Sequence, residues 1–208
     1  MILLAFIVAV SSICAGFATK ENILVSHKKE IDLIENYFNS LTTFEANFVQ
    51  NYKHHVSHGV IKIKRPEKFY VDYLSGNTPV KLIVNGGVFK YYDKKLDQES
   101  SLPVGKTAIS IITQKHFSLA SRDIDVIDIS NTEAAISITL QKPSRKDEGT
   151  FKVTFRKIGD GIELSEIQIQ DIHDSVTITI SDIKHGAEIA DSVFVMRNKN
   201  YKKLDLGE

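Results

Sequence analysis

Three histidines are the most obvious metal-ligand candidates in this sequence. His54, His55 and His58 form the pattern HHxxH, and neutral imidazole nitrogens are good ligands for zinc. The pattern lies in the connection between two predicted strands, and no cysteine or carboxylate pair is near it in the sequence. It therefore lacks the helical HExxH arrangement of zinc enzymes. We predict a solvent-exposed loop here, and neither a metal nor another cofactor.

No sequence pattern for covalent catalysis is recognisable in this chain. It contains no GxSxG segment, no glycine-rich phosphate loop and no spaced pair of carboxylates. A serine, histidine and aspartate triad could still assemble from distant positions, but its oxyanion site would need a helix terminus or a turn. We predict that the protein is not an enzyme. A periplasmic hydrolase remains the alternative, and turnover of ester or phosphodiester substrates would reveal it.

The overall charge excludes an obvious nucleic-acid partner. The chain has 26 Lys+Arg and 26 Asp+Glu, so its formal net charge is zero. No basic helix interleaved with aromatic residues occurs. We therefore predict no nucleic-acid binding.

The charges are nevertheless unevenly distributed along the chain. Between Tyr52 and Lys95 the basic residues outnumber the acidic ones, whereas only acids occur from Ile158 to Ile183. The basic residues are Lys53, Lys62, Lys64, Arg65, Lys68, Lys81, Lys90, Lys94 and Lys95. If these two stretches form opposite flanks, they can orient an encounter with a partner protein. The alternative is that both are ordinary solvated strand faces.

The N-terminal segment is predicted to be a signal peptide. Residues 1–18 contain no charged side chain, and the apolar stretch Ile2–Val10 has signal-peptide length. Gly16 and Ala18 place small residues where a signal peptidase reads them, so we predict cleavage after Ala18 and an exported product. An uncleaved membrane anchor is the alternative, but a span needs about 20 apolar residues.

Cys14 distinguishes a soluble product from a lipid-anchored one. A lipoprotein signal requires a small residue just before the modified cysteine, and this chain has Ile13 there. We therefore expect Cys14 to leave with the signal peptide. The mature chain then has no cysteine, so its core must hold the fold without a disulfide.

One amphipathic helix is predicted near the start of the mature chain. Ile31, Ile34, Phe38 and Leu41 recur at spacings of three, four and three residues, with charged residues between them. This period predicts a helix from about Ile23 to Ser40.

After this helix the hydrophobic period changes to two, which indicates strands. Strands are predicted from Phe44, at Val60–Arg65, Lys68–Tyr73, Val80–Val84, Val88–Tyr92, Leu96–Ser100, Ile124–Ile129, Ala134–Leu140, Thr150–Arg156, Ile162–Gln170 and Val176–Ile183. Asn85-Gly86-Gly87 and Gly159-Asp160-Gly161 are predicted turns. The segment Gly105–Phe117 is predicted to be a short helix or an irregular lid.

This series of strands predicts a mostly β fold with a helical lid. Short connections favour an antiparallel meander, and two helical segments cannot cover both faces of so large a sheet. The sheet should therefore curl around them as an open half β-barrel. No linker or repeat divides the chain, so we predict one domain over residues 19–208, acting as a monomer.

Several motifs resemble a known family, the outer-membrane lipoprotein carrier proteins of the periplasm. The resemblance covers about residues 41–100 and, near the C-terminus, residues 190–194. Its pieces are Phe44-Glu45-Ala46-Asn47-Phe48-Val49-Gln50, Gly59-Val60-Ile61-Lys62-Ile63-Lys64-Arg65-Pro66-Glu67-Lys68-Phe69, Ile83-Val84-Asn85-Gly86-Gly87, Tyr91-Tyr92-Asp93 and Ala190-Asp191-Ser192-Val193-Phe194. Among these, the stretch around Lys64-Arg65-Pro66 is the most specific.

The resemblance implies an open β-barrel closed by helices, whose cavity shields the acyl chains of lipoproteins in water. It implies three kinds of partner: acylated lipoproteins, the inner-membrane lipoprotein-releasing ABC transporter, and an outer-membrane receptor or the outer membrane itself. Elementary physics agrees, because each exposed CH₂ costs about 0.8 kcal/mol. A lipoprotein sensor and a lipid-anchored receptor of the same shape remain alternatives.

The resemblance also assigns roles to individual residues. Arg65 matches an arginine that hydrogen-bonds carbonyls of the helical lid and holds the empty cavity shut, a role that suits a guanidinium with five donors. Phe69 and Val71 match positions at the cavity mouth, where many relatives carry tryptophan in place of Val71. The expected cavity lining is Phe44, Phe48, Ile63, Phe89 and Tyr91, and the expected lid residues are Ile31, Ile34 and Phe38. From periodicity alone, each of these apolar residues is equally well explained as plain core, and Arg65 as a solvated strand end.

Overall fold

A computed structural model describes residues 19–76, 79–103, 115–143, 149–171 and 173–196. The predicted signal peptide and residues 105–114 of the predicted lid segment lie outside the described residues. Among those that are described, no helix is both long and apolar enough to cross a membrane.

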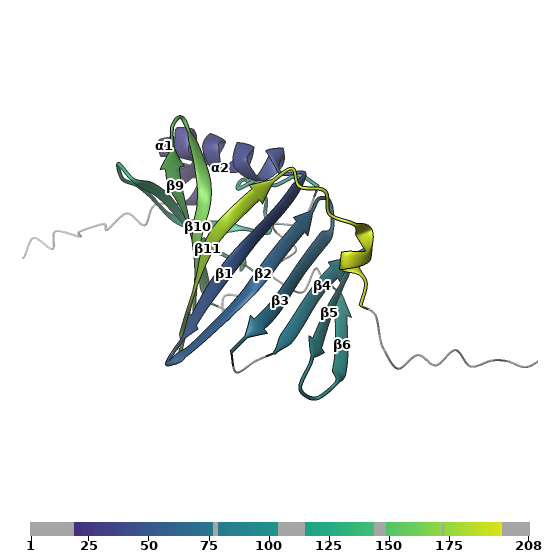
Figure 1. Ribbon diagram of the computed structural model, residues 1–208. Coiled ribbons are helices and arrows are strands. Elements are labelled where there is room, and N and C mark those ends of the chain that lie inside the picture. Colours follow the sequence, from purple (N-terminus) through teal and green to yellow (C-terminus); the bar gives the residue numbers. More distant parts are fainter. Residues whose placement is uncertain (1–18, 77–78, 104–114, 144–148, 172, 197–208) are drawn as a thin grey trace, which may run out of the picture.

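Two helices precede a long series of strands (Figure 1). The helices are α1 (Lys20–Ser26) and α2 (Lys28–Ser40). The strands are β1 (Thr43–Tyr52), β2 (His55–Lys64), β3 (Lys68–Ser75), β4 (Val80–Asn85), β5 (Val88–Asp93), β6 (Gln98–Pro103), β7 (Asp125–Asn131), β8 (Ala135–Gln141), β9 (Thr150–Ile158), β10 (Gly161–Gln170) and β11 (Ser175–His185), followed by the 3-10 helix η3 (Asp191–Phe194).

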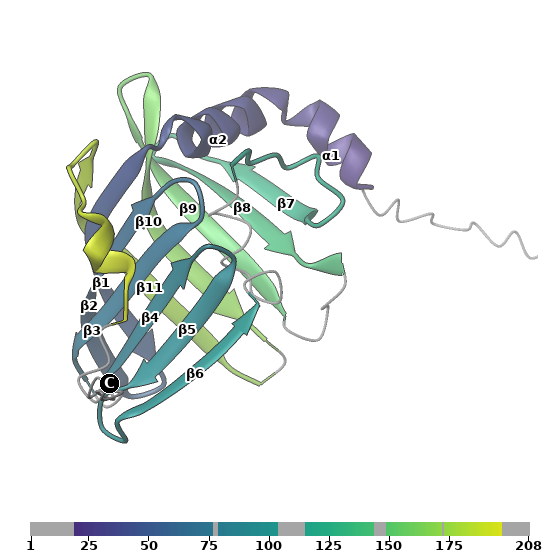
Figure 2. The ribbon, with the colours of Figure 1, turned by 90° about the vertical axis from the view of Figure 1, so that its right-hand side faces the viewer.

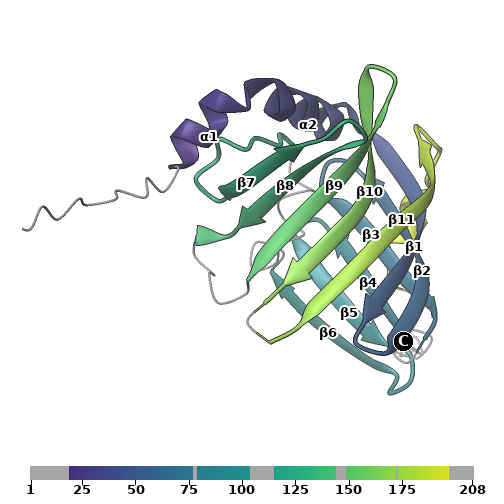
Figure 3. The same ribbon diagram turned by 90° about the vertical axis from the view of Figure 1, so that its left-hand side faces the viewer.

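All eleven strands form one antiparallel sheet in the order β6-β5-β4-β3-β2-β1-β11-β10-β9-β8-β7. Every neighbouring pair is consecutive in the chain except β1 and β11, which meet in the middle. Since β6 and β7 do not pair with each other, the sheet stays open. Figures 2 and 3 show it curling around a concave side, with both helices across one end. The predicted open half-barrel with a helical lid is confirmed.

Strand alternation places the large apolar side chains on the concave side. In the first half of the sheet, Phe44 lies opposite Ile63, Ile63 opposite Phe69, Phe69 opposite Val84 and Val84 opposite Phe89. This row runs across five strands. In β1 the residues between the buried ones, such as Glu45, are more exposed. The alternation of apolar and polar residues in the sequence therefore indicates which side chains of each strand face the buried concave side.

The helical segment differs from the prediction in one respect. It consists of two helices that meet at His27, whose backbone φ of −116° leaves the helical region. The Ser26 hydroxyl donates back to the carbonyls of Asn22 and Ile23 at the end of α1. Such side-chain bonds compete with the helical backbone ladder. Neither glycine nor proline marks this break, so the hydrophobic period alone predicted one helix.

Two further boundaries differ from the prediction. The strand predicted at Leu96–Ser100 is β6, Gln98–Pro103, because Asp93 accepts bonds from the amides of Lys95 and Leu96 and forms a turn there. The histidine motif does not lie wholly in a connection either, since β2 begins at His55.

Candidate functional site: the concave face of the sheet

The helices cover one end of the concave face through an aromatic cluster. Phe38 of α2 lies 4.5 Å from Phe117 and 5.8 Å from Phe155, measured between ring centroids. Tyr37 lies 5.4 Å from Phe155 and accepts a hydrogen bond from the Leu164 amide at 3.4 Å. Burial raises the pKa of Tyr37 to about 12, so this hydroxyl stays protonated. This end of the concave face is a packed core.

A segment after the undescribed residues 104–114 completes the cover. The side chain of Asn39 donates to the carbonyl of Phe117 and accepts from its amide, both at 2.9 Å. Glu35 accepts from the amide of Leu119 at 2.7 Å. Phe117 and Leu119 are 2% and 0% exposed, so they belong to the core under α2. The backbone of this loop is held by side chains of the helix, as buried loop amides require.

Arg65 connects the sheet to this cover. It follows β2, and its guanidinium donates to the carbonyl of Phe38 and, at 3.2 Å, to the carbonyl of Lys115. Partial burial lowers the pKa of Arg65, although an arginine remains charged at neutral pH. One side chain thus bridges the C-terminal end of α2 and the loop that packs beneath it.

The structure brings the predicted lining residues to one face, but it buries most of them. Phe44, Phe48, Ile63, Phe69 and Val71 are between 1% and 7% exposed. Phe89 and Tyr91 are half-buried on the same face. The lid residues Ile31, Ile34 and Phe38 are also buried and belong to the same core.

The two residues predicted at the cavity mouth are buried. Phe69 and Val71 are 5% and 7% exposed and belong to the main core, and their position at the mouth stays a prediction. Phe69 lies between Ile63 and Val84, and all three side chains are buried in the same core.

Away from the helices, the second half of the sheet leaves apolar side chains partly exposed. Val153 lies opposite Ile167, and Ile167 opposite Ile178, in one row across β9, β10 and β11. A second row, Phe151, Ile169 and Val176, lies beside it. All six side chains are half-buried. We call these two rows the apolar floor.

The first half of the sheet extends the same surface. Tyr73 and Leu82 are partly buried and pack against the core from β3 and β4. The Tyr73 hydroxyl donates to Gln50 at 2.6 Å, so this polar atom is satisfied without a ligand. The concave face therefore offers a broad apolar surface with few unsatisfied polar groups, which suits a flexible hydrocarbon better than a polar substrate.

The apolar floor of the second half was not identified from the sequence. The alternation in Thr150–Arg156, Ile162–Gln170 and Val176–Ile183 predicted strands but not which apolar residues stay uncovered. That distinction depends on tertiary packing, because Val153, Ile167 and Ile178 pack against the main core but stay half-buried. The only signal was the composition of these strands, in which apolar side chains (mostly isoleucine, valine and phenylalanine) alternate with polar ones.

The histidine motif forms no metal centre. His54, His55 and His58 are exposed, the first in the turn after β1 and the others on β2. Within the part of the chain that the structure describes, no group of three His, Cys, Asp or Glu residues could hold a metal ion.

The basic residues predicted to form a steering flank are largely paired. Lys62 contacts Glu45 at 2.8 Å, Lys90 contacts Glu99 at 2.7 Å, and Lys53 contacts Asp174 at 2.8 Å. The last pair joins the basic and acidic halves, which lie on either side of β1. Pairing reduces the field that this flank can project.

Comparison with known proteins agrees with this geometry. The family model described as "Outer membrane lipoprotein carrier protein LolA" matches residues 39–197. No curated protein matches the chain at the level of sequence.

Solved structures share the fold at low sequence identity. An uncharacterized conserved protein from Thermus thermophilus has a TM-score of 0.54 and 10% identity, covering 83% of this chain and 95% of that one. A DUF1329 family protein from Desulfovibrio piger has a TM-score of 0.50 and 9% identity, with coverages of 81% and 96%. A LolA-superfamily protein from Nitrosomonas europaea has a TM-score of 0.49 and 11% identity, with coverages of 86% and 98%.

Proposed function

Because the chain belongs to the outer-membrane lipoprotein carrier family, we propose that it binds the acyl chains of lipoproteins on its concave face and carries them across the periplasm. The observation that carries this proposal is the apolar floor. Two parallel rows of half-buried side chains extend beyond the helices on the side of the sheet that faces inward. Covering hydrocarbon there would remove apolar surface of both partners from water.

The proposed role needs no covalent step. The Arg65 bridge keeps the helices over one end of the concave face, and its release would let acyl chains reach the buried row around Phe69. A donor guanidinium suits this role, because the carbonyls of Phe38 and Lys115 can exchange it for water at modest net cost.

A cross-linking experiment tests the proposal. A photo-reactive amino acid is placed at Ile167 or Ile178 on the apolar floor, and at Lys152 on the opposite face of β9 as the matched control. We expect cross-links to acylated lipoprotein from the two floor positions only. Cross-links from Lys152 alone, or turnover of ester substrates by the purified protein, would contradict the carrier role.

We propose two further partners, in keeping with this role: the inner-membrane lipoprotein-releasing ABC transporter as donor, and an outer-membrane receptor or the membrane itself as acceptor. The uneven charge distribution would orient the encounter with the transporter. Since Lys62 and Lys64 are paired with Glu45 and Asp191, the effect on association rate should be small.

The association rate with the transporter's periplasmic domain, measured at low and high salt, tests this partner. Steering predicts that the rate falls with salt and falls again in the double variant Lys62→Glu/Lys64→Glu. Rates indifferent to both changes would leave the charge asymmetry without this function.

A further inference from the structure

A second hydrophobic cluster lies on the convex face of the first half of the sheet. After β11 the chain crosses back over β3 and β4, where Ile189 and Phe194 bury themselves against Ile83. Asp191 fixes this crossing by contacting Lys64 at 2.7 Å and Lys68 at 2.9 Å. Residues 186–196, which we call the C-terminal strap, therefore form a wall above the outer side of the strands.

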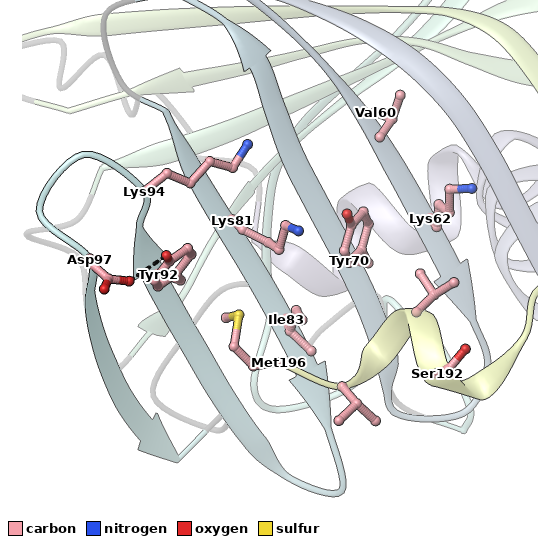
Figure 4. A pocket seen from close by; sticks show the side chains of 12 residues that line it. Val60, Lys62, Tyr70, Lys81, Ile83, Tyr92, Lys94, Asp97, Ser192 and Met196 are labelled. Atoms are coloured by element: carbon pink, nitrogen blue, oxygen red, sulfur yellow. Dashed lines mark hydrogen bonds between the residues drawn. The ribbon is translucent and has the colours of Figure 1, made fainter. Parts of the chain in front are cut away.

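A cavity of about 820 Å³ lies between the C-terminal strap and the strands, which is within the range of small-molecule sites. Figure 4 shows its lining side chains, which come from strands β2 to β5, the turn after β5 and the strap. They are Val60, Lys62, Tyr70, Lys81, Ile83, Tyr92, Lys94, Asp97, Ser192, Val193, Val195 and Met196. The strap side is mainly apolar, whereas the far end is polar.

Two lysines at this cavity share one aspartate. Lys81 and Lys94 both contact the single carboxylate of Asp72, Lys81 at a distance of 3.4 Å. Burial by itself raises the pKa of Asp72, but hydrogen bonds from Lys94 and Tyr70 outweigh it and hold that pKa below its ordinary value. Asp72 is thus a fixed anion that two ammonium groups share.

Of these two lysines, Lys81 is the one with spare donor capacity toward the cavity. Lys94 also donates to the carbonyl of Tyr73 at 2.8 Å. Lys81 instead lies over the ring of Tyr70, 5.6 Å from its centre. An ammonium group has three donors, so Lys81 can donate a hydrogen bond to a second anion as well as to Asp72. Lys62 is held more closely by its carboxylate, Glu45 at 2.8 Å, than Lys81 is by Asp72 at 3.4 Å, and Asp97 accepts from the Tyr92 hydroxyl at 2.7 Å.

We propose that this cavity binds one acyl chain that carries an anionic head group. The head group contacts Lys81, and the chain lies along Ile83, Val193 and Met196. This site is independent of the concave face, because the sheet itself separates the two. We infer this class of ligand because the ammonium group of Lys81 lies beside the apolar side chains of Ile83, Val193 and Met196.

The chain's own C-terminal residues do not supply this chemistry. They follow directly on Met196 and begin with basic residues: Arg197, Lys199, Lys202 and Lys203 precede Asp205 and Glu208. A basic segment does not complement Lys81.

Met196 offers a specific reporter for binding. Its methyl group lines the cavity, and the only other methionine in the sequence is Met1. The chain is labelled with ¹³C-methyl methionine and titrated with decanoate, with decyl phosphate, with the uncharged 1-decanol and with inorganic phosphate. We expect a saturating shift of the Met196 signal with decanoate and decyl phosphate, a weaker response to 1-decanol and none to inorganic phosphate.

Three variants locate the ligand. Lys81→Gln should weaken decanoate binding by about fivefold, as loss of one half-exposed charge contact does. Lys53→Gln removes an equally paired charge outside the cavity and should leave binding unchanged. Ile178→Glu, on the apolar floor, should also leave the Met196 shift unchanged, while it abolishes any binding to the concave face.

The outcomes separate this proposal from the carrier role. Equal affinity for decanoate and 1-decanol, or no Met196 shift at saturating ligand, would overturn the convex site. A Met196 shift lost in Ile178→Glu but kept in Lys81→Gln would overturn it too, because the response would then come from the concave face.

Discussion

The guanidinium of Arg65 donates to the backbone carbonyl of Phe38, although 26 residues separate the two in the chain. Phe38 is the last buried residue of α2, and its carbonyl lies at the end of the helix, where it also accepts a hydrogen bond from the Leu41 amide at 3.3 Å. Arg65 adds a second donor to this carbonyl and thereby attaches the end of the helix to the sheet. The same side chain reaches Lys115, so three segments depend on it.

Replacing Arg65 should loosen the cover more than the sheet. In Arg65→Leu the carbonyls of Phe38 and Lys115 lose the guanidinium donor, although Phe38 keeps the Leu41 amide, and we expect a loss of about 1–3 kcal/mol in the free energy of unfolding. Amide hydrogen exchange should rise first at Phe117 and Leu119, which lie in the loop held by α2. Denaturant titration and exchange mass spectrometry measure both effects. Arg156→Leu, at an exposed arginine paired with Glu163, is the control and should cost less than about 1 kcal/mol. Equal losses in both variants would contradict the bridging role.

The apolar floor can be separated from the core by two substitutions. Ile167→Gln places a polar group at a half-buried position, so it should weaken binding of a fluorescent hydrophobic probe several-fold while lowering stability by about 1 kcal/mol. Phe155→Ala removes a side chain with 0% exposure and should cost about 3–5 kcal/mol. Probe titration and denaturation, run on both variants, give the comparison. If Ile167→Gln unfolds the protein as severely as Phe155→Ala does, the floor is part of the core.

Gly59 is required by a close approach within the sheet. A Cβ atom at this position would collide with the carbonyl oxygen of Asp72 and lie 2.5 Å from the ring of Phe48. Gly59→Ala should therefore cost about 1–3 kcal/mol, because the backbone of β3 must shift. Gly161→Ala is the matched control, since the nearest atom to a Cβ there is the carbonyl oxygen of Ile158 at 3.7 Å. Thermal unfolding of the two variants decides the point, and similar melting temperatures would show that β2 and β3 adapt freely.

The C-terminal strap should depend on pH through Asp191. Hydrogen bonds from Lys64 and then Lys68 lower the pKa of Asp191 to about 2 from an ordinary 3.8. A lowered carboxyl pKa stabilises the folded state above the unfolded value, and that contribution is lost as the pH falls through the folded value. The stability difference between wild type and Asp191→Asn should therefore be constant from neutral pH to about 4 and vanish towards pH 2.

Denaturant titration of the two proteins from pH 7 to pH 2 measures this difference. Taking the difference cancels carboxylates common to both chains, such as Asp72. Because Asp191 is exposed, high salt should reduce the effect. A difference that persists unchanged at pH 2 would show that Asp191 acts through its shape and not its charge.

The sequence by itself determined the architecture of this protein. Alternation such as Phe44, Ala46, Phe48 assigns one side of each strand to the core, and short connections between strands permit only antiparallel neighbours. The spacing of Ile31, Ile34 and Phe38 likewise fixes which face of α2 is buried. These are local periodicities, so a single sequence can reveal them. The arginine at position 65 could be singled out because it lies in the most specific stretch shared with the carrier family.

The tertiary structure alone decided which apolar residues are covered and which remain available. Phe69 and Ile167 alternate in the same way along their strands, but Phe69 is buried in the main core, whereas Ile167 packs against that core and stays half-buried. The pairing of Lys64 and Lys68 with Asp191, and the cavity beneath the C-terminal strap, join positions more than 120 residues apart. Burial and ion pairing depend on which distant segments the curvature of the sheet brings together. The hydrophobic period within one strand or helix carries no information about those long-range contacts.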